Sequence, residues 1–224
     1  MSQEVFEAIR AGDAKRLAHR IAEDPSLALA RDESGLSAVM RARYRWRSDL
    51  VEILLEAAPE LDLFEASALG RISRMEALLD ADPDLVRAWS PDGFTALHLA
   101  SLFGIRAAVG LLLARGADAS AVSRNPMMVT PLHSAAAGPG DRRPVAEALL
   151  DAEAEVDART HGGLTPLQAA AENGDEELVE LLLARGADPT LVNEEGKTAI
   201  DLAVEAGYEE LAEELAEELR EEAS

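Results

Sequence analysis

The amino-acid sequence predicts an all-α solenoid built from about seven stacked helix pairs. A short motif begins at Thr95, Thr130 and Thr165, and a more divergent copy begins at Thr198. These threonines lie 35, 35 and 33 residues apart, and a fixed period in this range is typical of helix–turn–helix units that stack on their neighbours. Hydrophobic residues form 48% of the chain but aromatic residues only 4%. The core is therefore expected to consist of closely packed Leu, Ala, Val and Ile side chains.

Residues 159–192 show how the sequence specifies each helix pair. Thr165 can cap the first helix with its hydroxyl group, and Pro166 suits the first helical position because that position needs no N–H donor. Gly174 can adopt the positive φ that ends this helix. The second helix is predicted from apolar residues at positions i, i+3 and i+4, which are Leu178, Leu181 and Leu182. A single pair cannot bury both apolar faces, so each pair must stack on the next.

We expect one domain that spans residues 1–224, because each unit of a repeat array packs on its neighbours. In the first half, Gly35 and Gly93 lie 58 residues apart, and so do the Asp-Pro dipeptides that begin at Asp24 and Asp82. This offset indicates a block of two units that is present twice. The predicted units, of which the first and last are caps, are 1–31, 32–59, 60–89, 90–123, 124–158, 159–192 and 193–224.

Four segments depart from the repeat pattern. Trp46 stands where other units have the glycine that ends the first helix, which predicts a longer or tilted helix in the second unit. Pro59 and the lack of a tip glycine predict a shortened turn in the third unit. Residues 125–128 lengthen the turn of the fifth unit, and residues 138–144 add about two residues between its helices. Insertions in solenoids fall on loops, often on the binding face.

The C-terminal stretch 209–219 places a leucine at every fourth position and surrounds it with glutamates. This pattern is typical of a helix with one buried stripe. We interpret it as a helix that caps the end of the array, since a terminal unit needs a polar outer face. An acidic tail that interacts with a partner is the alternative.

The repeated unit resembles the ankyrin repeat. Residues 161–174, followed by residues 178–188, carry several of the diagnostic positions within one period. The match is clearest over residues 92–206 and extends over nearly the whole chain. The spacing, with its Phe-Glu-Ala and Asp-Pro elements, is most similar to that of stand-alone ankyrin arrays of bacteria. The resemblance implies helix pairs joined by projecting finger turns, a concave groove and a role in protein–protein interaction.

Catalysis finds little support in the sequence. The resemblance places His98 and His133 where the family often has a histidine that hydrogen-bonds the neighbouring finger, which indicates a structural role. No spacing of histidines and carboxylates suggests a metal site, and the chain has no cysteine. Residues 196–198 imitate the end of a phosphate-binding loop, but Leu191 stands where that loop needs a glycine. We therefore expect a protein that is not an enzyme and that needs no cofactor and no metal.

The formal net charge of −22 restricts the partners. An acidic chain repels phosphate backbones, so nucleic acid is not expected as a partner, and self-repulsion favours a monomer. No stretch reaches the ~18 uninterrupted apolar residues that a membrane-spanning helix needs. The first residues also lack the pattern of an export signal. We expect a cytoplasmic protein that binds no membrane.

The ankyrin resemblance implies a concave groove lined by residues beside each finger glycine and near the end of each first helix. The candidate binding residues at these positions are Leu36, Tyr44, Arg45, Trp46, Asp92, Phe94, Leu102, Phe103, Asn125, Met127, Met128, His161, Leu164, Glu172, Asn173, Glu194 and Glu195. Aromatic and methionine side chains, which form interface hot spots, gather in the first two-thirds of the groove. Alternatively, Phe94 and Phe103 only fill gaps between repeats. The last third is acidic and is expected to attract a basic segment of the partner.

Four arginines alternate along the first helix of the second unit, at Arg41, Arg43, Arg45 and Arg47. Helical spacing divides them between two faces. Our first interpretation is a solvated helix with internal salt bridges to nearby acids. A site for an anionic partner is the second.

The primary hypothesis is a non-catalytic protein–protein interaction scaffold that binds a partner protein through its concave groove. One alternative is an enzyme or small-molecule receptor that uses the groove near His133, Met127 and Met128. The other is a regulatory or inhibitory subunit of a specific enzyme. The sequence does not separate this last hypothesis from the first.

Overall fold

The computed structural model describes residues 2–57, 60–139 and 142–222. In these residues the chain forms fourteen α-helices and no strand, which confirms the predicted all-α solenoid. The helices are α1 (Ser2–Ala11), α2 (Ala14–Glu23), α3 (Ala38–Tyr44), α4 (Ser48–Glu56), α5 (Leu63–Ala68), α6 (Ile72–Ala81), α7 (Ala96–Leu102), α8 (Arg106–Ala114), α9 (Pro131–Ala137), α10 (Arg143–Asp151), α11 (Pro166–Glu172), α12 (Glu176–Ala184), α13 (Ala199–Ala206) and α14 (Glu209–Glu222). Each of the seven ranges expected from the sequence contains one helix pair.

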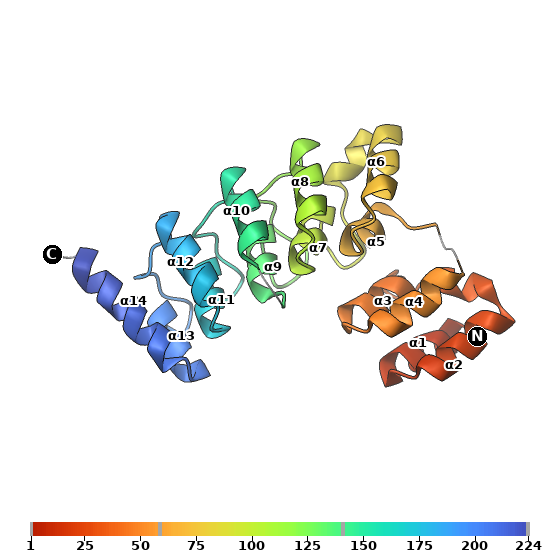
Figure 1. Ribbon diagram of the computed structural model, residues 1–224, viewed down its shortest axis with the longest axis horizontal. Helices are drawn as coiled ribbons and strands as arrows, with labels where there is room; N and C mark the ends of the chain where they lie inside the picture. Colours follow the sequence, from red (N-terminus) through yellow and green to blue (C-terminus); the bar gives the residue numbers. More distant parts are fainter. Residues whose placement is uncertain (1, 58–59, 140–141, 223–224) are drawn as a thin grey trace.

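The helices form two rows (Figure 1). The odd-numbered helices make the inner row, in which α5, α7, α9, α11 and α13 each pack against the next. The even-numbered helices make the outer row, and each odd-numbered helix also packs on the even-numbered helix that follows it. The core lies between the rows, and its largest fully buried side chains are Ile9, Leu17, Leu50, Leu54, Met75, Leu79, Leu97, Leu99, Leu112, Leu132, Leu149 and Leu167.

The capping residues predicted from the sequence take their expected places. The Thr165 hydroxyl accepts a hydrogen bond from the Gln168 N–H (3.3 Å), and Pro166 is the first residue of α11. The two Asp-Pro dipeptides each begin a short 3-10 helix, in which Asp24 and Asp82 accept a backbone N–H two residues later. The 58-residue offset in the sequence therefore repeats a local structure as well as a pair of residues.

A finger, the turn that precedes an inner helix, is closed by a backbone hydrogen bond. In the fourth unit the Ser90 N–H donates to the Phe94 carbonyl (2.8 Å). In the fifth unit the bond runs from the Ser123 N–H to the Val129 carbonyl (2.8 Å) and so encloses two more residues. The predicted lengthening at residues 125–128 is confirmed.

Consecutive fingers are joined to one another by their backbones. Each of the last three fingers donates one N–H to the finger before it: Arg124 to Gly93 (2.8 Å), His161 to Met127 (3.0 Å) and Glu194 to Gly162 (3.0 Å). These bonds fix the spacing of the fourth to seventh units, because neither partner can move without losing a hydrogen bond.

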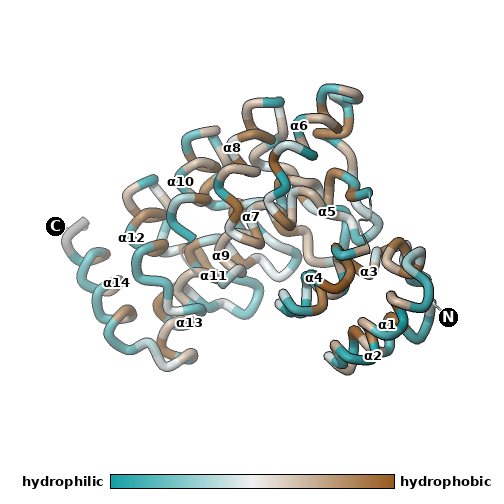
Figure 2. The backbone as a smooth tube through the Cα atoms, turned by 45° about the vertical axis from the view of Figure 1, so that its right-hand side comes forward, coloured by the Kyte–Doolittle hydropathy of each residue, from teal (hydrophilic) through white to brown (hydrophobic). Residues whose placement is uncertain are grey.

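Helices α1 to α4 form a group that is turned relative to the rest of the array (Figures 1 and 2). In the outer row α2 packs on α4, but the described residues show no comparable packing between α4 and α6. Only six residues separate α4 from α5, whereas sixteen separate α8 from α9. The third unit therefore lacks a full finger, and the finger of the second unit lies directly against that of the fourth, with Gly35 beside Pro91. Pro59, on which the predicted shortened turn depends, lies outside the described residues.

Of the two outcomes predicted for the second unit, the longer first helix is wrong, whereas α3 is turned with its group relative to the later helices (Figures 1 and 2). Helix α3 has seven residues, as α7, α9 and α11 do. Trp46 itself adopts φ +56°, the left-handed conformation that Gly174 (φ +65°) adopts in the sixth unit. Met128 (φ +52°) and Glu153 (φ +62°) are also left-handed. In each of these residues the Cβ atom makes the left-handed conformation costly, whereas glycine adopts it freely.

The helix predicted at the C-terminal end is present, and the insertion in the fifth unit is described only in part. Leu211 and Leu215 are buried on α14, whose remaining side chains up to Arg220 are mostly exposed glutamates, as a helix with one buried stripe requires. In the insertion, Gly138 ends α9, and its α-carbon lies so near the Leu102 carbonyl that a Cβ would collide with it. Residues 140 and 141 lie outside the described part of the chain.

Relief of the strain at Glu153 is expected to stabilise the fold. Glu153 is exposed and occupies the position that follows an outer helix, where Gly116 and Gly186 are found in other units. Glu153→Gly is expected to raise the free energy of unfolding by about 0.5–1 kcal/mol, because the left-handed penalty exceeds the entropy that glycine adds to the unfolded chain. Urea denaturation measures the change.

Gly116→Ala is the matched control for this prediction. A Cβ at Gly116 meets no atom within 4 Å, so the substitution tests the backbone conformation (φ +85°) alone. It is expected to destabilise by about 1 kcal/mol. A destabilised Glu153→Gly variant would contradict the argument.

Candidate interaction surface

Two histidines and one glutamine connect each inner helix to the following finger. The His98 Nδ1 atom lies 2.7 Å from the Thr95 hydroxyl, and its Nε2 atom lies 3.0 Å from the Val129 carbonyl. Because a carbonyl only accepts, Nε2 carries the hydrogen and Nδ1 is the acceptor. His133 makes the same pair of contacts, with Leu164 as the carbonyl partner (2.9 Å). The predicted structural role of both histidines is confirmed.

Burial holds both histidines in the neutral state. It lowers the pKa of His98 to about 4 and also lowers the pKa of His133, because the charged ring would lose its hydration. Both ring nitrogens of His133 are occupied by hydrogen bonds. This arrangement suits a support that fixes neighbouring repeats, and it leaves His133 no free nitrogen for proton transfer.

Phe103 lies at the centre of an aromatic junction between the second and fourth units. Its ring centroid lies 5.8 Å from that of Tyr44 and 4.9 Å from that of Trp46, with Trp46 in an edge-on arrangement. The Arg43 guanidinium lies 4.3 Å from the Phe103 centroid and donates to the Ala68 carbonyl (2.9 Å). Phe103 therefore fills a gap between repeats, as the alternative interpretation predicts.

The residues of this junction differ in their access to solvent. Phe103 is 7% exposed and Leu36 is 4% exposed, so both lie beneath the surface. Trp46 is 45% exposed. Tyr44 is half-buried, and its hydroxyl donates to the Asp92 carboxylate (2.7 Å), which ties α3 to the finger of the fourth unit. Of these candidate residues, Trp46 offers an apolar surface that a partner could contact directly.

The fifth finger carries the other exposed apolar side chains of the predicted groove. Met127 is 53% exposed and Met128 is 45% exposed. The Asn125 side chain fixes the backbone of this finger, since it donates to the Asp92 carbonyl (3.1 Å) and accepts from the Met127 N–H (3.1 Å). Phe94 is half-buried beside the His98 ring, at 5.7 Å between centroids. Leu102 and Leu164 are also half-buried.

Apart from Leu164, the candidate residues of the last two units are polar and exposed. These are His161, Glu172, Asn173, Glu194 and Glu195. Asn173 serves the scaffold as well, because its side chain donates to the Ala136 carbonyl (3.2 Å). Glu195 forms an ion pair with Lys197 (2.8 Å), which lowers the pKa of Glu195 through the hydrogen bond from Lys197. The carboxylates of this part of the surface thus come from the seventh finger, with Glu194 and Glu195, and from Glu172 on α11.

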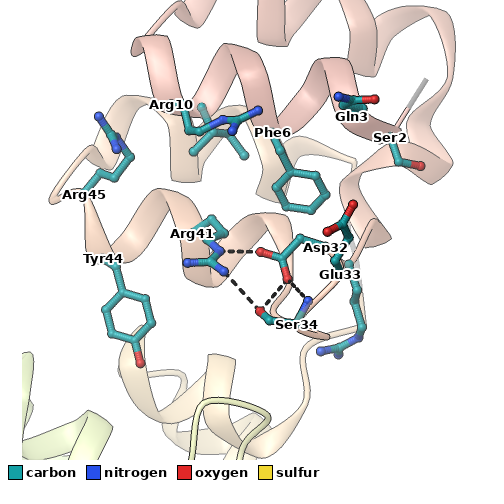
Figure 3. A pocket seen from close by; sticks show the side chains of 12 residues that line it. Ser2, Gln3, Phe6, Arg10, Asp32, Glu33, Ser34, Arg41, Tyr44 and Arg45 are labelled. Atoms are coloured by element: carbon teal, nitrogen blue, oxygen red, sulfur yellow. Dashed lines mark hydrogen bonds and ion pairs between the residues drawn. The ribbon is translucent and has the colours of Figure 1, made fainter. Parts of the chain in front are cut away.

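A hollow at the N-terminal end contains residues that the sequence interpretation missed. The hollow measures about 890 Å³ and lies between α1, the finger of the second unit and α3 (Figure 3). Arg45 and Tyr44 were candidates from the sequence, but Phe6 and Arg10 were not, because the first unit lacks the threonine motif. Arg10 stands two residues before the left-handed Gly12, and this register could have identified it.

The described residues lack two further features. They contain no helix that is both long and apolar enough to cross a membrane. They also contain no group of three or more His, Cys, Asp or Glu side chains arranged to hold a metal ion.

Comparison with protein families identifies the repeat. A family model described as ankyrin repeats, three copies, matches residues 63–160 and residues 132–223. The matched stretches begin at the start of α5. They therefore cover the regular part of the array and leave out the turned group α1 to α4.

Individual relatives share the repeat over different lengths. Ankyrin repeat and SOCS box protein 16 of Mus musculus is 38% identical over 116 residues, which are 50% of this chain and 26% of that protein. Neurogenic locus notch homolog protein 4 of Homo sapiens is 40% identical over 126 residues, 56% of this chain and 6% of that protein. The ankyrin repeat protein YahD of Escherichia coli (strain K12) is 29% identical over 186 residues, 67% of this chain and 92% of that protein. The chain thus spans a small part of the two animal proteins and nearly all of the bacterial one.

The buried histidine makes stability depend on pH. The folded state keeps His98 neutral down to about pH 4, whereas the unfolded chain binds the proton near its ordinary pKa of 6.5, so stability falls as the pH falls between these values. His98→Gln removes the titration and keeps the hydrogen bonds, as Gln168 does in the sixth unit. Between pH 7 and pH 5 the wild type is expected to lose about 2 kcal/mol more than His98→Gln in urea denaturation. Equal losses would contradict this assignment.

The contact between Tyr44 and Asp92 is expected to stabilise the turned group of helices. Tyr44→Phe removes the hydroxyl and should lower the free energy of unfolding by about 1–2 kcal/mol, because the acceptor is a carboxylate. Tyr208→Phe is the control, since the exposed Tyr208 hydroxyl has no hydrogen-bond partner among the described residues. Thermal denaturation of both variants makes the comparison, and equal melting temperatures would speak against the contact.

Proposed function

The chain belongs to the ankyrin-repeat family, and we propose that it is a non-catalytic interaction module that binds a partner protein along its concave side. Ankyrin repeats generally mediate protein–protein interaction. In this proposal the chain acts as a monomer in the cytoplasm. Its partner is a protein and not nucleic acid or a membrane, because the net charge of −22 repels polyanions.

The observation that carries the proposal is the pair of exposed methionines on the fifth finger. Met127 and Met128 expose about half of their surface, and Met128 does so from a left-handed backbone that disfavours any residue but glycine. Burial of these side chains against a partner would stabilise the complex, because it removes apolar surface from water. Methionine suits such a site because its side chain adapts to the shape of the partner.

Acidic residues of the last two units indicate the chemistry of the partner. Glu194 and Glu195 follow in the array, together with the exposed Glu172 on α11. Carboxylates at the edge of an interface attract a basic segment and accelerate its encounter. We infer a partner segment with an apolar residue that contacts the methionines and Lys or Arg residues that meet the glutamates.

The two alternatives from the sequence differ in their support. An enzyme or small-molecule receptor near His133 is disfavoured, because that ring is neutral and its nitrogens are occupied. A regulatory or inhibitory subunit of one enzyme remains compatible with the proposed surface, since it would use the same residues. The relatives differ widely in name, and ankyrin repeats do not specify one partner.

The proposal is tested by selecting peptides from a random displayed library on the immobilised protein. Selected peptides are expected to combine basic residues with an apolar residue. The variants Met127→Ser/Met128→Ser and Glu194→Lys/Glu195→Lys should each weaken binding about tenfold or more, as loss of a hot spot or reversal of a charge pair does. Fluorescence anisotropy measures the affinities.

The control is Glu52→Lys/Glu76→Lys, which makes the same charge change on exposed residues of the outer helices α4 and α6. It should leave the affinity within about twofold of the wild type, because charges beyond a Debye length are screened. The proposed surface is wrong if the control variant loses binding while both groove variants keep it.

A further inference from the structure

The net negative charge of the chain lies in its later part. Residues 1–50 contain nine Lys and Arg and eight Asp and Glu, so the whole excess of negative charge lies beyond them. The hollow between α1 and α3 is lined by four arginines, at Arg10, Arg31, Arg41 and Arg45. The hollow therefore differs in charge from the rest of the chain, whose net charge is −22.

Two of these arginines are neutralised within the fold. Arg31 pairs with Asp62 (3.0 Å), and Arg41 pairs with Asp32. Burial acts to raise the pKa of Asp32, but hydrogen bonds from Ser34, from Arg41 and from backbone N–H groups outweigh burial and lower the pKa to about 2. The Asp32 carboxylate is therefore charged, and its oxygens accept hydrogen bonds from within the second unit.

The other two arginines have no such partner. Arg10 on α1 and Arg45, which directly follows α3, are exposed, and in the described part of the chain no carboxylate lies within ion-pair distance of either. Figure 3 shows both on the same edge of the hollow, whereas Glu33 lies on the opposite edge. Two guanidinium groups from different segments thus flank one opening without an anion between them.

Two aromatic side chains also line the hollow, with the hydrogen-bonded Asp32, Ser34 and Arg41 between them (Figure 3). Phe6 and Tyr44 are half-buried, and their rings line the hollow (Figure 3). The hollow, at about 890 Å³, is large enough for several side chains and is too open for a single small ion. An aromatic wall with arginines at its edge suits a peptide that carries both an apolar side chain and carboxylates, since each arginine can bind a carboxylate through two N–H groups.

We propose that this hollow binds an acidic segment of a protein partner. Carboxylates of the segment pair with Arg10 and Arg45, and an apolar side chain packs against Phe6 and Tyr44. The site selects against a nucleic acid, because a long polyanion would meet Glu33 and then the acidic remainder of the chain. This inference shares with the proposed function only the premise that the chain binds proteins. The residues of the hollow are not those of the methionine finger.

The test uses a short labelled peptide that alternates Glu and Leu, with Gln–Leu and Lys–Leu peptides of the same length for comparison. The Glu–Leu peptide is expected to bind the full chain most tightly in fluorescence anisotropy, with an affinity that falls as salt screens the charges. Arg10→Glu/Arg45→Glu should weaken it about tenfold or more, because two attractions become repulsions. Arg87→Glu/Arg106→Glu, the same change at exposed positions elsewhere, should leave it within about twofold.

Three results would overturn the inference: equal binding of the Glu–Leu and Gln–Leu peptides, equal affinities of the two arginine variants, or complete competition by inorganic phosphate. If circular dichroism shows that Arg10→Glu/Arg45→Glu does not fold, Arg10→Gln/Arg45→Gln takes its place with the same expectation. Peptides selected on the methionine finger should still bind the arginine variants. The failure of one site is thereby distinguished from the failure of the other.

Discussion

The array depends on one hydrogen bond that each regular inner helix makes to the finger that follows. The side chain three residues after the capping threonine donates to a finger carbonyl: His98 to Val129, His133 to Leu164 and Gln168 to Lys197. All three donors are buried, so an unpaired nitrogen or carbonyl there would be costly. This requirement sets the register between neighbouring units, and the backbone bonds between fingers then hold the same spacing at the surface.

In the second and third units this hydrogen bond is missing. The third unit lacks a full finger, and the equivalent position of the second unit is Met40, an apolar residue buried with Leu36 and Phe103. Hydrophobic contact replaces the directional bond at this junction. The second unit consequently packs across the third onto the fourth, and aromatic rings fill the space that a regular finger would occupy.

This departure from regular stacking separates two chemical surfaces. On one side of the junction lies the hollow with its unpaired arginines, and on the other side lie the methionine finger and the seventh finger with its two glutamates. The shared scaffold is apolar and continuous, so the surfaces differ only in the side chains added to it. If both proposed sites bind, this separation would let one repeat domain recognise segments of opposite charge.

The sequence by itself determined the features that arise within one unit or between adjacent units. Thr165, Pro166 and Gly174 act within one helix, and the threonine period reports contacts between adjacent pairs, so caps, helix order and the fold class could all be predicted. The sequence did not determine the burial of Phe103 or the conformation of Trp46. The burial of Phe103 follows from contact between units two apart, whereas Trp46 takes the left-handed conformation that glycine adopts at the same position of other units. The hollow was also hidden, because Arg10 and Arg45 come from different units and only tertiary packing places them on one edge.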